Sequence, residues 1–157
     1  MEINKERTAF SGFQNSGSTA TIDMDATLVS TNKIDALFSY KGFKAYQPLN
    51  TWWFEQGIIL HTEFRDGNVP AGFQQLRVFK DALGCLPEQV QTVRVSSDTA
   101  CYQHDLLRYC STGENSQFGV IEFAIGCNVT KEFKKAFEQI EESEWKPIYN
   151  AAWCGGS

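Results

Sequence analysis

The order of strand-like and helix-like segments along the chain is the feature that most constrains its fold. Three apolar, β-prone segments come first, at residues 20–29, 44–54 and 57–64, and two more follow at 90–98 and 119–127. A segment with helical spacing precedes each of the last two, and a third such segment ends the series. Strands joined by short turns form an antiparallel meander, whereas strands that follow a helix return parallel to their neighbour. The order predicts an α/β protein with a mixed five-stranded sheet and helices on its faces.

Three helices are expected from capping residues and apolar spacing. Asn68 is the expected N-cap of the first helix, with Pro70 in its first turn and Gly84 where it stops. The second helix is expected over residues 102–110, and Thr130 is the expected N-cap of the third.

Length and charge limit the classes of protein to consider. The chain has 157 residues, which suits one domain, and a net charge of −5, which counts against a compact free-standing DNA-binding module. Residues 33–80 nevertheless carry six Lys or Arg against four Asp or Glu. We find no apolar run long enough to span a bilayer and no apolar signal segment at the N-terminus, and so expect a cytoplasmic protein without a membrane partner.

Composition also suggests boundaries and the state of the cysteines. Residues 1–20 are polar and rich in Gly and Ser, so we expect a flexible linker or a truncated edge there, then a domain over 21–148 and a tail or cloning remnant over 149–157. The five cysteines contain no C-x-x-C pair, which favours reduced, mostly buried thiols over a zinc site.

Two aspartates stand at the ends of strand-like segments. Asp25 follows the apolar residues of the first segment, and Asp98 closes the fourth. Open α/β sheets bind ligands beyond the carboxyl ends of their strands, so these carboxylates converge if the two strands are parallel neighbours. A hard cation such as Mg²⁺ or Mn²⁺ then offsets their repulsion, and two such ions can activate a water or a 3′-hydroxyl against a phosphodiester. The alternative is that Asp98 caps the next helix. Asp23 shares a strand face with Asp25, so either is a candidate ligand, and Asp25 is preferred because it lies nearer the strand end.

Four short motifs carry a resemblance to a known family. They are Ile-Asp-Met-Asp-Ala-Thr at 22–27, Tyr-Gln-Pro-Leu at 46–49, Arg-Asp-Gly-Asn-Val at 65–69 and Ser-Asp-Thr-Ala at 97–100. In this order and spacing, over roughly residues 20–148, the chain resembles the DDE-type transposases of bacterial insertion sequences. The resemblance implies a ribonuclease-H-like fold and metal-dependent cleavage and strand transfer of DNA, with Asp25 and Asp98 as the first two catalytic acids. It also implies DNA partners (transposon ends and target), a homodimer in the intact enzyme and a nucleoid-associated location.

The chain departs from the family pattern in two places. Thr99, Ala100 and Cys101 stand where the family has Gly and an aromatic residue after the second acid. The family's third acid, a Glu on a helix beyond an inserted region, has no good match, because the late glutamates lie on the outer face of the last expected helix or just after it; these are Glu138, Glu141, Glu142 and Glu144. We therefore expect an incomplete catalytic core that is inactive alone.

Basic and aromatic residues interleave before the second strand, which suggests contacts with DNA. Lys41 and Lys44 are candidates to meet phosphates, and Phe43 is a candidate to stack on an unpaired base. Arg65 is a further candidate phosphate contact. The alternative is a surface hairpin whose aromatic side chains pack inward.

Two other functions remain open at this stage. One is a ribonuclease-H-like module that performs no chemistry and serves as an interaction or structural unit. The other is a self-contained nuclease that recruits Glu122 or Asp105 as its third acid.

Overall fold

The computed structural model describes residues 18–113 and 117–145. The chain divides into two compact units, Met1–Cys127 and Asn128–Ser157, and each is treated by itself. Unit 1 contains strands β1 (Thr19–Ala26), β2 (Val29–Ser30), β3 (Ala45–Tyr46), β4 (Leu49–Trp53), β5 (Ile58–Glu63), β6 (Thr92–Ser97) and β7 (Glu122–Ile125), helices α2 (Gln75–Leu83) and α3 (His104–Thr112), and the 3₁₀ turn η1 (Thr99–Cys101). Unit 2 contains helix α4 (Lys131–Glu138) and the 3₁₀ turn η2 (Glu142–Glu144).

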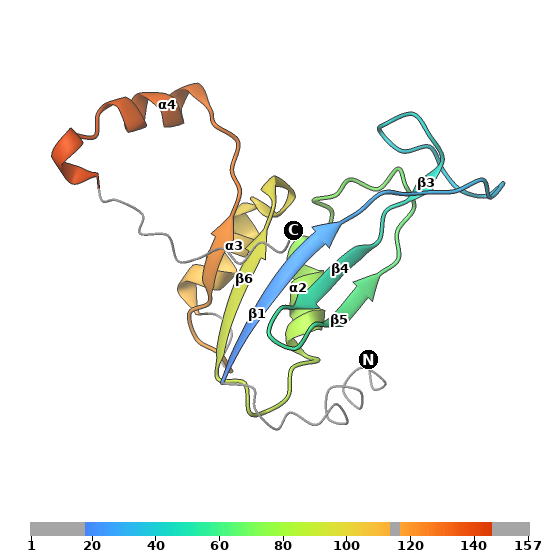
Figure 1. The fold of residues 1–157 in the computed structure, drawn as a ribbon, viewed down its shortest axis with the longest axis horizontal. Coiled ribbons are helices and arrows are strands. Elements are labelled where there is room, and N and C mark those ends of the chain that lie inside the picture. Colours follow the sequence, from blue (N-terminus) through green and yellow to red (C-terminus); the bar gives the residue numbers. More distant parts are fainter. Residues whose placement is uncertain (1–17, 114–116, 146–157) are drawn as a thin grey trace. The chain divides into compact units, whose positions relative to one another are not determined.

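Five strands form one mixed sheet in the order β5-β4-β1-β6-β7 (Figure 1). β1 pairs antiparallel with β4, and β4 pairs antiparallel with β5, which gives the meander. β6 pairs parallel with β1, and β7 pairs parallel with β6. The expected mixed five-stranded sheet is therefore confirmed, and its centre is the first strand of the chain.

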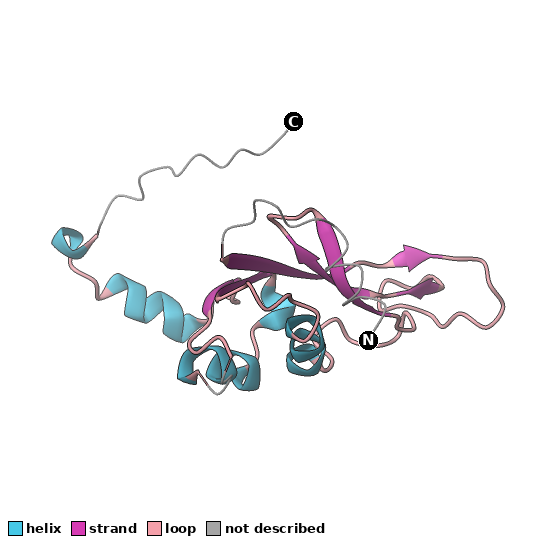
Figure 2. Ribbon diagram, turned by 90° about the horizontal axis from the view of Figure 1, so that it is seen from below, coloured by secondary structure: helices cyan, strands magenta, loops and turns pink. Residues whose placement is uncertain are grey.

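The core of unit 1 lies between the sheet and helices α2 and α3, which Figure 2 shows on one side of the sheet. Ala20, Ile22 and Met24 alternate along β1 and are buried, so this face of the strand meets the helices. The two tryptophans of β4 show the same alternation: Trp53 is 0% exposed, and Trp52, on the opposite face, is 39% exposed. Burial of one whole face fixes the register, since a slip of one residue would turn every core side chain outward.

The expected second strand is interrupted. Residues 44–54 form two strands, β3 and β4, separated by Gln47 and Pro48. Proline cannot donate a ladder hydrogen bond, and the Gln47 amide donates instead to the Arg65 carbonyl (2.8 Å). β3 pairs with β2 in a separate two-stranded ribbon, and residues 29–46 form a projection that we call the arm.

The first helix begins later than expected. α2 starts at Gln75, and its N-cap is Gln74, which has a left-handed backbone (φ 53°) and makes no side-chain cap bond. Asn68 does not cap it, because residues 64–74 are held as a loop: Gly67 packs so closely that an added Cβ would lie 2.4 Å from the Ala45 carbonyl oxygen. The helix does end at Gly84, as expected.

The other two helices agree with expectation apart from their bounds. α3 covers 104–112 instead of 102–110, and a left-handed Gly113 ends it. Thr130 caps α4 as predicted, with its hydroxyl accepting from the Phe133 amide (3.1 Å). At the N-terminal side, β1 begins at Thr19, so the expected linker of residues 1–20 overlaps the sheet by two residues. The expected tail of residues 149–157 lies outside the described residues.

Candidate strand-end acidic site

The parallel register of β1 and β6 places the predicted aspartates at one end of the sheet. Asp23 pairs with Ser96, and Met24 pairs with Ser97, so positions 25 and 98 follow as the next pair in register. Side chains at 23 and 25, and at 96 and 98, belong to the same alternating set on each strand. Asp25 and Asp98 thus directly follow the last paired residues, Met24 and Ser97, at the carboxyl ends of adjacent parallel strands.

Two serine hydroxyls tie the strands together at this end. Ser96 Oγ donates to Asp23 Oδ1 (2.9 Å), and Ser97 Oγ donates to the Met24 carbonyl (2.7 Å). Asp23 is half-buried and is engaged by the neighbouring strand. Its local role is therefore to join β1 to β6.

Asp25 is held by its own strand end and remains exposed. The Thr27 hydroxyl donates to Asp25 Oδ2, which orients that carboxylate through a contact two residues along the chain. Asp23 is bonded across to β6, whereas the hydrogen bond to the Asp25 carboxylate comes from its own end of the chain segment. This difference supports the preference for Asp25 over Asp23 as a ligand for an added group.

Asp98 caps a helical turn, although not the helix that the alternative interpretation expected: it is the N-cap of η1, its Oδ1 accepts from the Ala100 amide (2.9 Å), and the N-cap of α3 is Gln103. Capping does not exclude a ligand role, because a carboxylate has two oxygens and about four acceptor positions. The cap fixes the direction of the side chain, which stays exposed.

The carboxylates of Asp98 and Asp23 both affect the pKa of the Cys101 thiol. Burial is the main cause that raises the pKa of Cys101, to about 11, and the negative charges of Asp98 and Asp23 raise it further. A hydrogen bond with Ser97 and the positive charge of Arg65 act in the opposite direction. One buried thiol thus lies within electrostatic reach of acids from both β1 and the end of β6.

Arg65 corrects one sequence-based expectation. It is buried instead of lying on the surface: its Nη1 donates to the Ala71 carbonyl (3.1 Å), and its Nε lies 3.5 Å from Glu63 Oε1. Burial lowers the pKa of Arg65 from its ordinary value, and Glu63 acts against this shift. The guanidinium fastens the loop that follows β5, so it does not present itself to a phosphate at the surface.

The three arm residues named as DNA contacts differ in exposure. Lys41 is exposed at the tip, with its Nζ 5.8 Å from the centre of the Tyr40 ring, and Phe43 is 37% exposed. Lys44 is half-buried, and its Nζ donates to the carbonyls of Ile34 (2.7 Å) and Lys33 (3.4 Å). Lys44 therefore closes the arm on itself, and the exposed lysines of the arm are Lys33 and Lys41.

Of the two proposed substitutes for a third acid, Glu122 is displaced along the sheet from the ends of β1 and β6, and Asp105 is engaged locally at the start of α3. Glu122 pairs with Arg94, three positions before the β6 residue Ser97, a displacement of about 10 Å along the strand, and its carboxylate binds the Arg94 Nε (2.7 Å). Asp105 Oδ1 accepts from the Leu106 amide at the start of α3. Within residues 18–113 and 117–145, no group of three or more His, Cys, Asp or Glu side chains is placed to hold a metal ion.

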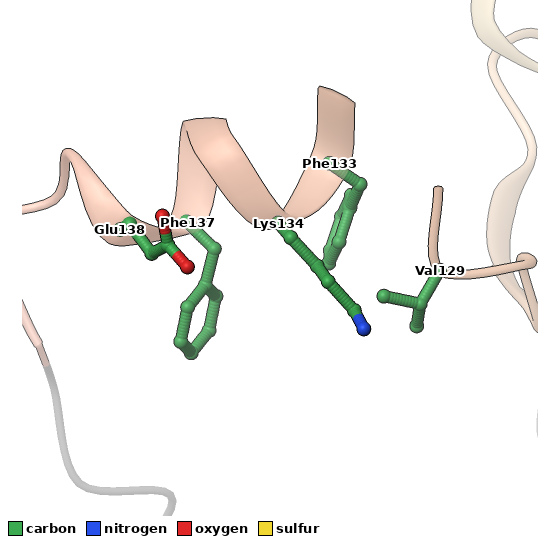
Figure 3. Close-up of a pocket in the computed structure, with 5 residues that line it drawn as sticks. All are labelled: Val129, Phe133, Lys134, Phe137 and Glu138. Carbon is green, nitrogen blue, oxygen red and sulfur yellow. The ribbon is translucent and has the colours of Figure 1, made fainter. Parts of the chain in front are cut away.

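Unit 2 carries a hollow of its own, of about 310 Å³, along α4. Figure 3 shows Phe133 and Phe137 projecting from the helix toward the same side, with Val129 nearby. Apolar side chains make up most of the lining of this hollow, and Lys134 and Glu138 are its charged members. The glutamates of this region, including Glu138, are exposed, as the sequence pattern indicated.

Sequence reasoning missed Ser96, Thr27 and Cys101 as parts of this site. Ser96 had a usable signal, since it precedes Asp98 by two residues and so shares its strand face. Among the described cysteines, Cys85, Cys101 and Cys110 are buried and not in a disulfide, as expected, and Cys127 is exposed and also not in a disulfide.

Comparisons with known proteins add no assignment. No protein-family model matches the chain, and no curated protein or solved structure is significantly similar to it. Among the described helices, none combines the length and apolar character that a bilayer crossing requires. What the structure defines is an α/β unit with acidic side chains at the ends of two parallel central strands.

Proposed function

We propose that this chain is the part of a DDE-type transposase catalytic domain that supplies the first two acids, Asp25 and Asp98. In the intact enzyme these carboxylates hold Mg²⁺ or Mn²⁺ for cleavage and strand transfer of DNA. The observation that carries the proposal is the parallel register of β1 and β6. Positions 25 and 98 directly follow Met24 and Ser97, the last residues that pair between these strands.

The topology supports a ribonuclease-H-like assignment for unit 1. The strand order is β5-β4-β1-β6-β7, with the first three strands antiparallel and the last three parallel. This order and these directions match those expected of a ribonuclease-H-like sheet. In an open sheet of this kind, the ends of adjacent parallel strands are where ligands bind.

The donor set fits a hard cation in type but is incomplete in number. Carboxylate oxygens suit Mg²⁺ and Mn²⁺, and a Mg²⁺ ion keeps several waters when few protein ligands bind it. Asp25 and Asp98 supply two carboxylates, and the described residues contain no third group in position. The bound ion would supply activation of a water or hydroxyl, while Thr27 and the η1 amides keep the two carboxylates oriented.

A titration with Mn²⁺ tests this proposal. We expect weak binding, with a dissociation constant above about 0.1 mM, because the site has few charged ligands. Paramagnetic line broadening in amide spectra should be confined to residues 23–27 and 97–101. Asp25→Asn together with Asp98→Asn abolishes it, whereas Asp35→Asn, an exposed aspartate in the arm, leaves it unchanged. Binding that survives the double substitution would overturn the assignment of these ligands.

The missing third acid favours one second candidate, a ribonuclease-H-like module that performs no chemistry. That candidate predicts no localised broadening by Mn²⁺ at any concentration. The same titration therefore separates the two.

A further inference from the structure

The arm, residues 29–46, leaves the sheet next to the acidic site. β1 ends at Ala26, and the arm begins three residues later, at Val29. Figure 1 shows it extending beyond the arrowhead end of β1, on the side where the carboxyl ends of the central strands lie. The base of the arm therefore lies near the strand end that carries Asp25.

The arm exposes apolar surface that its own folding does not cover. Ile34 is 94% exposed, Tyr40 is 78% exposed and Phe38 is 63% exposed. Several exposed large apolar side chains on one small ribbon are a feature that marks interaction sites.

The backbone of the arm is nevertheless well ordered by its own hydrogen bonds. The Gly42 amide donates to the Ser39 carbonyl (2.9 Å), which closes a turn with Tyr40 and Lys41 at its corners. Gly42 takes φ +81°, which only glycine adopts readily, and the Ser39 amide donates to the Phe43 carbonyl (2.8 Å) to close the ribbon. The tip is a tight hairpin that presents one aromatic ring and one cation.

A hollow of about 590 Å³ lies along the same ribbon. Phe38 and Phe43 contribute rings to its lining, Asn32 and Thr31 contribute polar groups, and Lys44 closes one side. This combination of aromatic faces with a few amide and hydroxyl groups suits a flat, polar-edged ring such as a nucleobase.

Charge on the arm points to a polyanionic partner. Its 18 residues contain three lysines and one aspartate, in a chain whose net charge is −5. With Lys44 engaged by backbone carbonyls, Lys33 and Lys41 are the exposed cations, and Lys41 lies beside the Tyr40 ring. Aromatic rings for stacking alternate here with cations for phosphates, which is the pattern of single-strand nucleic-acid binding.

We propose that the arm binds an unpaired nucleic-acid strand, with bases stacking on Tyr40, Phe38 and Phe43 and phosphates meeting Lys33 and Lys41. A duplex keeps its bases stacked on each other, so it cannot use these rings. The inference deepens the proposed function, since it names unpaired DNA beside the acids as the substrate, but it requires no metal.

The test measures fluorescence anisotropy of a labelled 20-nucleotide oligo-dT strand, and of the same strand annealed to oligo-dA, with the full chain in EDTA. We expect the single strand to bind more tightly than the duplex. Tyr40→Ala and Phe38→Ala should each weaken single-strand binding at least about 5-fold, given the usual worth of one stacked base. Lys41→Glu should weaken binding and reduce its dependence on salt.

Two matched controls separate the arm from general surface effects. Phe54→Ala removes an exposed phenylalanine from the opposite end of the sheet, where its amide donates to the Thr21 carbonyl. Lys131→Glu reverses an exposed charge on α4 in unit 2. Both should leave binding unchanged, and Tyr40→Ala, at an exposed turn position, should leave the circular dichroism spectrum unchanged.

Several results would overturn the inference. The first is an absence of oligonucleotide binding, and the second is an equal loss of binding affinity with Phe54→Ala and Tyr40→Ala. The third is a dimer in sedimentation that Tyr40→Ala dissociates, because a second copy of the chain would then be the occupant of the arm. Asp25→Asn with Asp98→Asn should retain strand binding in EDTA, and Tyr40→Ala should retain Mn²⁺ broadening. Failure of one assay therefore leaves the other proposal standing.

Discussion

The hydrogen bond between Ser96 and Asp23 yields a quantitative prediction that separates the roles of the two aspartates of β1. Removing either partner breaks a 2.9 Å bond from a hydroxyl to a carboxylate. Hydrogen bonds to charged groups contribute about 1.5–3 kcal/mol, and the half-buried position of Asp23 places this one near or below the lower end, at about 1–2 kcal/mol.

The assay is a double-mutant cycle of Asp23→Ala and Ser96→Ala by urea unfolding, followed through tryptophan fluorescence. Trp53 is buried in the core and reports the transition. We expect a coupling energy of about 1–2 kcal/mol. A free-energy difference of this size corresponds to roughly 0.5–1 M urea in the unfolding midpoint at the m-values usual for small domains. Asp25→Asn should change stability by less than about 0.5 kcal/mol, because its carboxylate is exposed.

A neutral pair in the same sheet is the control for this cycle. Thr62 Oγ1 donates to Asn50 Oδ1 over the same 2.9 Å at an exposed position, and its coupling should be about 0.5 kcal/mol or less. A coupling for Asp23 and Ser96 no larger than that of this pair would refute the argument that Asp23 joins the central strands. A large loss of stability in Asp25→Asn would refute the division of roles.

Four further predictions follow from packing and ionisation. Gly67→Ala should destabilise unit 1 by about 1–3 kcal/mol, because the new Cβ meets the Ala45 carbonyl; chemical unfolding measures this. Trp53→Ala should cost about 3–5 kcal/mol by the same method, since the side chain is wholly buried. With its pKa raised to about 11 mainly by burial, Cys101 is almost entirely a neutral thiol at pH 8, so peptide mapping after iodoacetamide should find Cys127 labelled and Cys101 protected. Because an unfolded thiol ionises near pH 9.0, the contribution of Cys101 to stability is complete below that pH and is lost as the pH rises toward about 11; a Cys101→Ala variant should show a shallower decline.

The sheet could be predicted because each of its strands is recognisable from neighbouring residues in the sequence. Each strand of the meander and each parallel strand shows alternation or an apolar run bounded by turn residues, and the connections dictate the pairing. The placement of Asp25 and Asp98 at the carboxyl ends of adjacent parallel strands follows from that pairing alone. The N-cap of α4 was predictable for the same reason, because Thr130 and the amide that it caps are three residues apart.

What the sequence did not reveal depends on contacts between distant residues. Asn68 and Pro70 look like a helix start, yet the Arg65 guanidinium and the close approach of Gly67 to Ala45 hold this segment as a loop. Lys44 looks like a free cation, yet it donates to a carbonyl ten residues earlier. The third catalytic acid that the family resemblance requires has no counterpart among the described residues.

The central position of β1 has a consequence for how the chain acquires its structure during synthesis. β1 leaves the ribosome before its parallel partner β6, which follows 73 residues later. Until then one side of β1 has no ladder, and long-range pairing of this kind is slow to form. A nascent chain that pauses before residue 92 would leave that side of the apolar central strand unpaired and open to pairing with another chain.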